Sequence, residues 1–84
     1  MGLPDEPVTL TVARVEELNR KLSSLRHDIN NHLSLILAAS ELMRHKPQMT
    51  EQMLNTVTEQ PPKITHALVK FSTEFEKALG IKRP

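Results

Sequence analysis

Cysteine is absent from this chain of 84 residues, so neither a disulfide bond nor a thiolate metal site can stabilise its fold. Aromatic residues are scarce too, with two phenylalanines and no tryptophan or tyrosine. A chain of this length rarely obtains more than about 3–5 kcal/mol from a single core without a staple or a partner. The composition therefore favours one small domain that gains part of its stability by oligomerisation.

Long apolar runs and an excess of charge of one sign are also missing. The longest apolar run, residues 35–39, is far too short to span a bilayer. The first residues, MGLPDEPVT, are polar and acidic, unlike a secretory signal. A formal net charge of +1 gives no electrostatic reason to bind nucleic acid or an anionic membrane. We therefore expect a cytoplasmic protein with no nucleic-acid partner and no membrane association.

Both glycines lie near the chain ends, and no strand-like alternation or Asn-Gly turn lies between them. The dominant pattern is helical, because apolar residues recur in alternating steps of three and four over about four heptads. One polar residue, His32, interrupts this seam, whose members are Val15, Leu18, Leu22, Leu25, Ile29, His32, Ile36, Ala39 and Met43. Basic residues precede Pro47, as is typical of a helix C-terminus. The pattern predicts a flexible lead-in over residues 1–8 and a first helix over about 9–45.

A second helix is predicted over about 50–79, after a short loop at 46–49. Thr50 can cap its start and Gly80 its end, followed by a tail at 81–84. Pro61 and Pro62 should kink or break it, because proline removes backbone hydrogen bonds inside a helix. The expected fold is all-α, an antiparallel two-helix hairpin over residues 9–80. Pairing two hairpins into a four-helix bundle would bury both apolar stripes, so we expect a homodimer.

The segment LRHDINNHLSLI, residues 25–36, carries polar residues that helices do not favour. His27 faces away from the seam, and Asn31 lies one turn later on nearly the same side, while Asp28 is about a quarter-turn from His27. Helix stability alone would select other residue types here, so this pattern favours chemistry on an exposed surface. Three further residues continue the same stripe, namely Ser34, Ala38 and Glu41. His32 instead occupies the seam, where we expect a partly buried, register-setting residue that Asp28 could orient.

The four histidines do not predict a metal site. His27 and His32 are five residues apart and point in different directions, and no His-x-x-x-His or Glu-x-x-His pair occurs. The spacing of a Ser-His-Asp hydrolase is missing as well. We expect neither a metal nor a cofactor in this chain.

LRHDINNHLSLI resembles the phospho-acceptor motif, or H-box, of two-component sensor histidine kinases, in the variant with His-Asp-x-x-Asn inside a long helix. PPKITHALVKFSTEF, residues 61–75, is similar to the second helix of the same dimerisation and histidine phosphotransfer domain. The resemblance covers about residues 15–79. It implies that His27 accepts the phosphoryl group, that Asp28 orients or deprotonates the imidazole, and that Asn31 positions a hydrolytic water. Ser34, Ala38 and Glu41 would then lie where a response regulator receiver domain docks.

The chain departs from the family in two respects. Many members have proline five residues after the phospho-histidine, where this chain has His32. It also has too few glycines for phosphate-binding loops, so alone it is not a kinase. The resemblance implies a dimeric phospho-acceptor that exchanges phosphoryl groups with a receiver domain or with a separate kinase ATP-binding domain. The alternatives are a dimeric helical module that binds a signalling partner without phosphorylation, and a structural helical adaptor with no signalling role.

Overall fold

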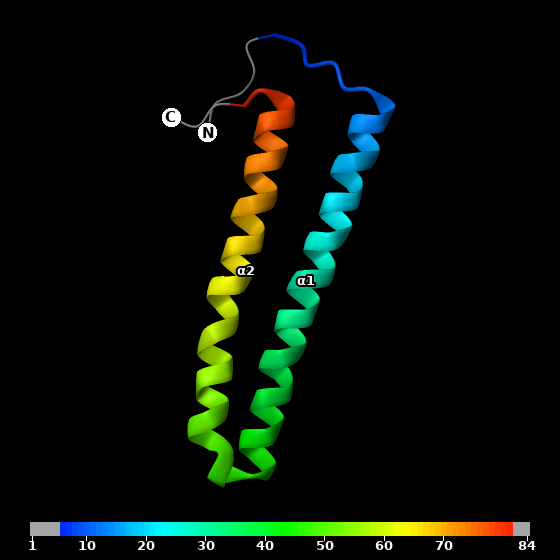
Figure 1. Cartoon of the computed structure of the whole chain (residues 1–84). Coiled ribbons are helices and arrows are strands. Elements are labelled where there is room, and N and C mark those ends of the chain that lie inside the picture. The colour runs from blue at the N-terminus through cyan, green and yellow to red at the C-terminus, as the bar shows by residue number, and fades with distance from the viewer. Residues whose placement is uncertain (1–5, 82–84) are drawn as a thin grey trace.

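The computed structural model describes residues 6–81, which form two antiparallel helices lying side by side (Figure 1). Helix α1 spans Val12–His45 and helix α2 spans Thr50–Leu79, and a short 3-10 helix, Pro47–Met49, joins them. The hairpin measures 58 × 28 × 12 Å, so its helices form a single layer. The predicted helical hairpin is thereby confirmed, while residues 1–5 of the lead-in and 82–84 of the tail lie outside the described residues.

The helix ends follow from local capping. Helix α1 begins at Val12 and not near Thr9, because the Thr11 hydroxyl accepts a hydrogen bond from the Arg14 amide at 3.1 Å. Helix α2 ends where Gly80 adopts a left-handed conformation with φ of 69°, as its predicted capping role requires. Thr50 is not a cap: it is the first helical residue, and its hydroxyl donates to the Pro47 carbonyl at 2.7 Å.

Helix α2 contains both prolines without a break in its helical assignment. Proline lacks the backbone N–H that would bond to the carbonyl four residues earlier, so two rungs of the helical ladder are missing there. The predicted break is therefore wrong, and a kink at Pro61 and Pro62 stays a prediction.

The interior between the helices is thin. Among the described residues, only two apolar side chains are buried, Leu25 at 8% exposure and Ala39 at 2%. Most other seam residues are half-buried against α2, namely Leu18, Ile29, His32, Ile36 and Met43. At the N-terminal end of the seam, Val15 and Leu22 remain exposed. The seam therefore packs within one chain and leaves other apolar side chains uncovered.

The hairpin has two unlike faces. An approximate two-fold axis perpendicular to the layer relates the two antiparallel helices. A residue that follows a contact residue on α1 therefore lies on the same face of the layer as a residue that follows a contact residue on α2. On one face, four exposed apolar residues each come next in sequence after a residue that contacts the other helix. We call this set the apolar face: Leu22, Leu33, Leu68 and Phe75. Residues directly before contact residues lie on the opposite side, the groove face: Ser24, Asp28, Asn31 and Lys70. One face thus lacks an apolar partner, and the other is polar beside Asp28 but carries exposed leucines nearer the loop, Leu35 and Leu42.

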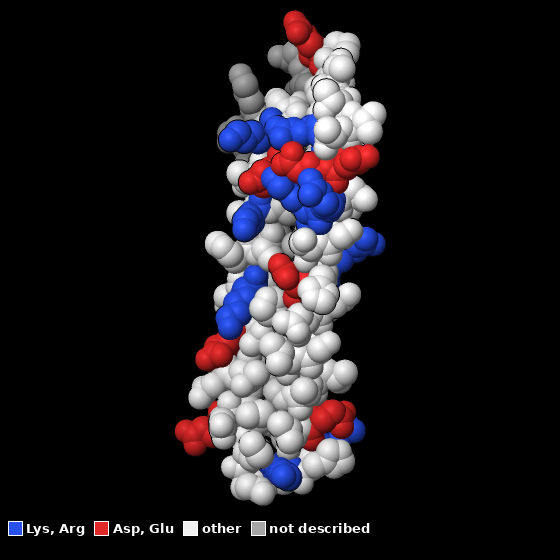
Figure 2. Space-filling model, turned by 45° about the vertical axis from the view of Figure 1, so that its right-hand side comes forward, with Lys and Arg blue, Asp and Glu red and all other residues white. Residues whose placement is uncertain are grey.

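Charged side chains are unevenly distributed along the hairpin. Figure 2 shows a dense band of them toward the open end, where the helices begin and end, and a largely uncharged stretch nearer the loop. Within residues 6–81, neither helix contains a stretch apolar enough to cross a membrane.

Candidate functional site

The predicted phospho-acceptor residues lie halfway along α1 and are exposed. His27, Asp28 and Asn31 each belong to unbroken helix, where neighbouring residues differ by about 100° around the axis. Asn31 is therefore only about 40° from His27, whereas Asp28 turns toward the groove face. The structure places the histidine and the amide on one accessible side, as the sequence pattern predicts.

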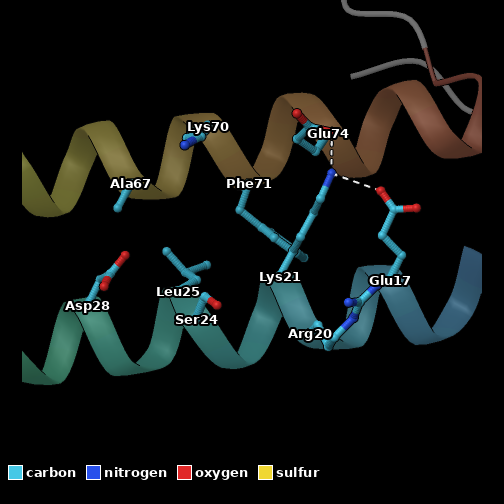
Figure 3. A pocket seen from close by; sticks show the side chains of 10 residues that line it. All are labelled: Glu17, Arg20, Lys21, Ser24, Leu25, Asp28, Ala67, Lys70, Phe71 and Glu74. Atoms are coloured by element: carbon cyan, nitrogen blue, oxygen red, sulfur yellow. Dashed lines mark hydrogen bonds and ion pairs between the residues drawn. The ribbon is translucent and has the colours of Figure 1, made fainter.

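No hydrogen bond or ion pair within the described part of the chain joins His27 to Asp28 or to Asn31. The Asp28 carboxylate instead extends from α1 toward Ala67 of α2 (Figure 3). The His27 imidazole is thus exposed to solvent and is not held by either neighbouring side chain.

The three predicted docking residues continue along the exposed side of α1. The Ser34 hydroxyl donates to the Asn30 carbonyl at 2.8 Å, so this hydroxyl is turned back onto the helix. Glu41 lies 3.5 Å from the His45 ring, a pair that is largely solvent-exposed. Ala38 lies between them and is also exposed. Their role in docking stays a prediction.

His32 makes a polar contact between the two helices. Its Nδ1 lies 2.7 Å from Oε1 of Gln60, a side chain only 3% exposed. Because an amide oxygen only accepts, the contact as drawn requires a proton on Nδ1. The predicted half-buried position of His32 is confirmed, but its partner is Gln60 and not Asp28. Sequence reasoning missed Gln60, although the two residues each lie 14 positions from Lys46 at the turn.

We expect replacement of Gln60 by leucine to reduce the free energy of unfolding by about 1–3 kcal/mol, because it leaves the His32 ring without its partner. His32→Leu should cost a similar amount by stranding the buried amide. The double variant should recover most of the loss, since two apolar side chains need no hydrogen bond. Urea unfolding of all four chains forms a double-mutant cycle. Additive losses would show that the 2.7 Å contact contributes nothing to stability.

A groove of about 610 Å³ runs along the groove face from Asp28 toward the open end (Figure 3). Its floor is apolar, formed by Leu25, Ala67 and Phe71. Charged and polar residues surround this floor, namely Glu17, Arg20, Lys21, Ser24, Asp28, Lys70 and Glu74. The groove borders the candidate site through Asp28 alone. No single-residue pattern in the sequence indicates it, because it arises only when the two helices are placed together.

Lys21 closes the far end of this groove. Its ammonium lies 2.8 Å from a Glu74 carboxylate oxygen on α2 and 3.2 Å from one of Glu17 on α1. Hydrogen bonding from Lys21 lowers the pKa of Glu17 and of Glu74 below the ordinary value of 4.5. Because its ammonium donates hydrogen bonds to Glu74 and to Glu17, the pKa of Lys21 is raised above 10.5. All three side chains are more than a third exposed, so the network adds little stability.

This network predicts a small dependence of stability on acid. A carboxylate whose pKa is lowered by folding contributes fully above its ordinary value of 4.5, and the contribution disappears as pH falls through the lowered pKa. Unfolding in urea from about pH 7 to about pH 3 should show this loss in the wild type. Lys21→Met should flatten the profile, whereas Lys63→Met, a lysine with no ion pair in residues 6–81, should not. Parallel profiles for wild type and Lys21→Met would contradict the assignment.

The histidines do not converge. Across the described ranges of both helices, no three His, Asp or Glu side chains gather closely enough to hold a metal ion. His27, His32 and His66 occupy different sides of the hairpin. The geometry therefore offers one exposed imidazole flanked by an acid and an amide, beside an amphipathic groove. Comparison of the chain with protein-family models, with curated proteins and with solved structures finds no match.

Proposed function

We propose that this chain is a histidine phospho-acceptor and dimerisation domain of two-component signalling. The observation that carries the proposal is the exposed His27 in the middle of a 34-residue helix, with Asn31 on the same side and Asp28 beside it. These residue types weaken helices, and the side chains of His27, Asp28 and Asn31 make no hydrogen bond or ion pair within residues 6–81 that would offset this cost. The resemblance of these residues to the H-box suggests phosphoryl transfer as the function for which helix stability is sacrificed here.

The proposed chemistry needs only groups that the site exposes. A nitrogen of the His27 imidazole attacks phosphorus, and the bond from phosphorus to the donor's leaving oxygen breaks. The imidazole proton passes to Asp28 or to water, while the leaving oxygen departs with the former bonding electrons. In the reverse direction, Asn31 holds a water near the phosphoryl group of a partner receiver domain. An amide serves there because it orients water without competing as a nucleophile.

The apolar face supports the dimerisation part of the proposal. Leu22, Leu33 and Leu68 remain 39–50% exposed in the single chain, with Phe75 at 40%. Exposed leucines spaced along both helices are what the core of a four-helix bundle requires. A second copy placed on this face would leave the groove face and His27 accessible on both chains. The partners of the proposed domain are therefore a second copy, a receiver domain and a separate kinase ATP-binding domain.

The direct test is transfer of labelled phosphate to the wild-type chain. We expect acid-labile, base-stable phosphate after incubation with a phosphorylated receiver domain, or with a kinase ATP-binding domain and ATP. Mass spectrometry should place the label on His27. A chain that binds the receiver domain but never acquires label would instead be the non-phosphorylated interaction module.

A further inference from the structure

The hydrogen-bonded ladder of α2 is incomplete near the middle of the hairpin. Pro61 and Pro62 carry no amide hydrogen, so the carbonyls of Val57 and Thr58, four residues earlier, lack their usual helical donors. The Thr58 hydroxyl donates to the Leu54 carbonyl at 2.7 Å, and a hydroxyl bonded back in this way favours bending of a helix. We therefore expect α2 to bend most easily over this stretch.

α1 carries a matching feature at the same level. The 2.7 Å contact between His32 and Gln60 places these two residues opposite each other. Because the helices are antiparallel, Ser34 and Thr58 each lie two residues from this contact toward the loop. The Ser34 hydroxyl donates to the carbonyl of Asn30, four residues earlier, as the Thr58 hydroxyl does on α2. Both helices are thus weakened at one level, which we call the hinge level: residues 30–34 and 54–62.

Polar contacts hold the two helices together on one side of the hinge level only. Toward the open end, Lys21 of α1 lies 2.8 Å from Glu74 of α2. Toward the loop, each hydrogen bond or ion pair of a described side chain lies within α1, or within α2 and the turn before it. The loop segment, residues 34–58, can therefore tilt about the His32–Gln60 contact.

The hinge level also divides the candidate site. His27 and Asp28 lie on its open side, whereas the predicted docking residues begin at it and continue along the loop segment: Ser34, Ala38 and Glu41. A receiver domain docked on the loop segment changes its distance from His27 whenever the hairpin bends. We propose that the hairpin bends at the hinge level and that the bend sets the reach between a docked receiver domain and His27. The second part rests on the proposed phospho-acceptor function.

Amide hydrogen exchange of the whole chain, resolved by NMR, tests the bend. In the wild type, the amides of residues 63–65 should exchange faster than those of 68–70, because hydrogen bonds beside a hinge open most often. Pro61→Ala combined with Pro62→Ala supplies two amide donors, and should slow exchange at 63–65 roughly tenfold relative to 68–70. Exchange at residues 33–35 of α1 should slow relative to 20–22 as well, because a bend of the hairpin opens both helices.

Thr73→Ala is the matched control, because alanine at this exposed position stabilises α2 without adding a backbone hydrogen bond. It should leave both exchange ratios at their wild-type values. Wild-type ratios in the double alanine variant would overturn the hinge. A change confined to α2 would also overturn it, since the prolines would then loosen only their own helix.

Phosphate transfer tests what the bend does. Potassium phosphoramidate is a small donor that needs no docking surface, and with it the double alanine variant should label His27 at the wild-type rate. Transfer from a phosphorylated receiver domain should be slower by roughly threefold or more, because the stiffened hairpin couples docking to His27 less well. Equal transfer rates would overturn the role of the bend. If no donor labels the wild-type chain, the proposed function and this role both fail, and the exchange ratios still decide whether the hairpin bends.

Discussion

Replacement of His27 by glutamine is expected to abolish acid-labile phosphorylation while changing the free energy of unfolding by less than about 0.5 kcal/mol. Glutamine keeps a polar side chain that helices accept, but it has no nucleophilic nitrogen. The side chain of His27 is exposed and makes no hydrogen bond within residues 6–81, so its removal costs the fold little. Phosphate transfer and urea unfolding, measured on the same preparation, separate the two effects.

Two further variants sharpen this result. His66→Gln removes another exposed histidine, from α2, and should label as the wild type does. Asn31→Ala should still accept phosphate and should stabilise the helix slightly, because alanine is the better helix former. Its expected defect is slower removal of phosphate from a receiver domain. Label on His27→Gln equal to wild type would place the acceptor elsewhere and refute the assignment.

The elements of the fold were predictable because each has a strong local signal. The alternation of three and four residues specifies long helices, Pro47 ends the first, and only glycine adopts the conformation at Gly80 without strain. The helical pattern predicts a start near Thr9, whereas α1 begins at Val12. Only Thr11 is positioned for its hydroxyl to accept the Arg14 amide. Such choices depend on geometry within one turn and not on residue type.

The site was only half predictable, for a different reason. Exposure of His27 and Asn31 follows from position on one helix, which periodicity gives directly. The partner of His32 and the groove beside Asp28 depend on how α1 and α2 are aligned, which periodicity alone leaves open. His32 and Gln60 are the same number of residues away from Lys46. In the Lys21–Glu74 pair, however, Glu74 is three residues farther from Lys46 than Lys21 is. The alignment of α1 with α2 therefore changes along the hairpin, and the position of the groove could be established only from the structure.

The apolar face carries the second large prediction. Leu22→Glu combined with Leu68→Glu is expected to convert the proposed dimer into a largely unfolded monomer. Burial of each leucine in a bundle contributes about 1.5–3 kcal/mol, and a dimer loses four of them. Within residues 6–81 the hairpin buries only two apolar side chains of its own, so it cannot compensate. Sedimentation equilibrium and helical circular dichroism, measured over a range of protein concentrations, report mass and folding together.

Leu35→Glu is the matched control for this prediction. Leu35 is 42% exposed, close to the 39% of Leu22, but it precedes the contact residue Ile36 and so lies toward the groove face. It is compared with Leu22→Glu alone, so each variant loses one half-exposed leucine from α1 and only the face differs. If dimerisation uses the apolar face, Leu35→Glu remains dimeric and helical and still accepts phosphate at His27. Equal disruption by both substitutions would mean that partners cover both faces, and a hairpin that stays folded and monomeric with Leu22→Glu and Leu68→Glu would show that it needs no second copy.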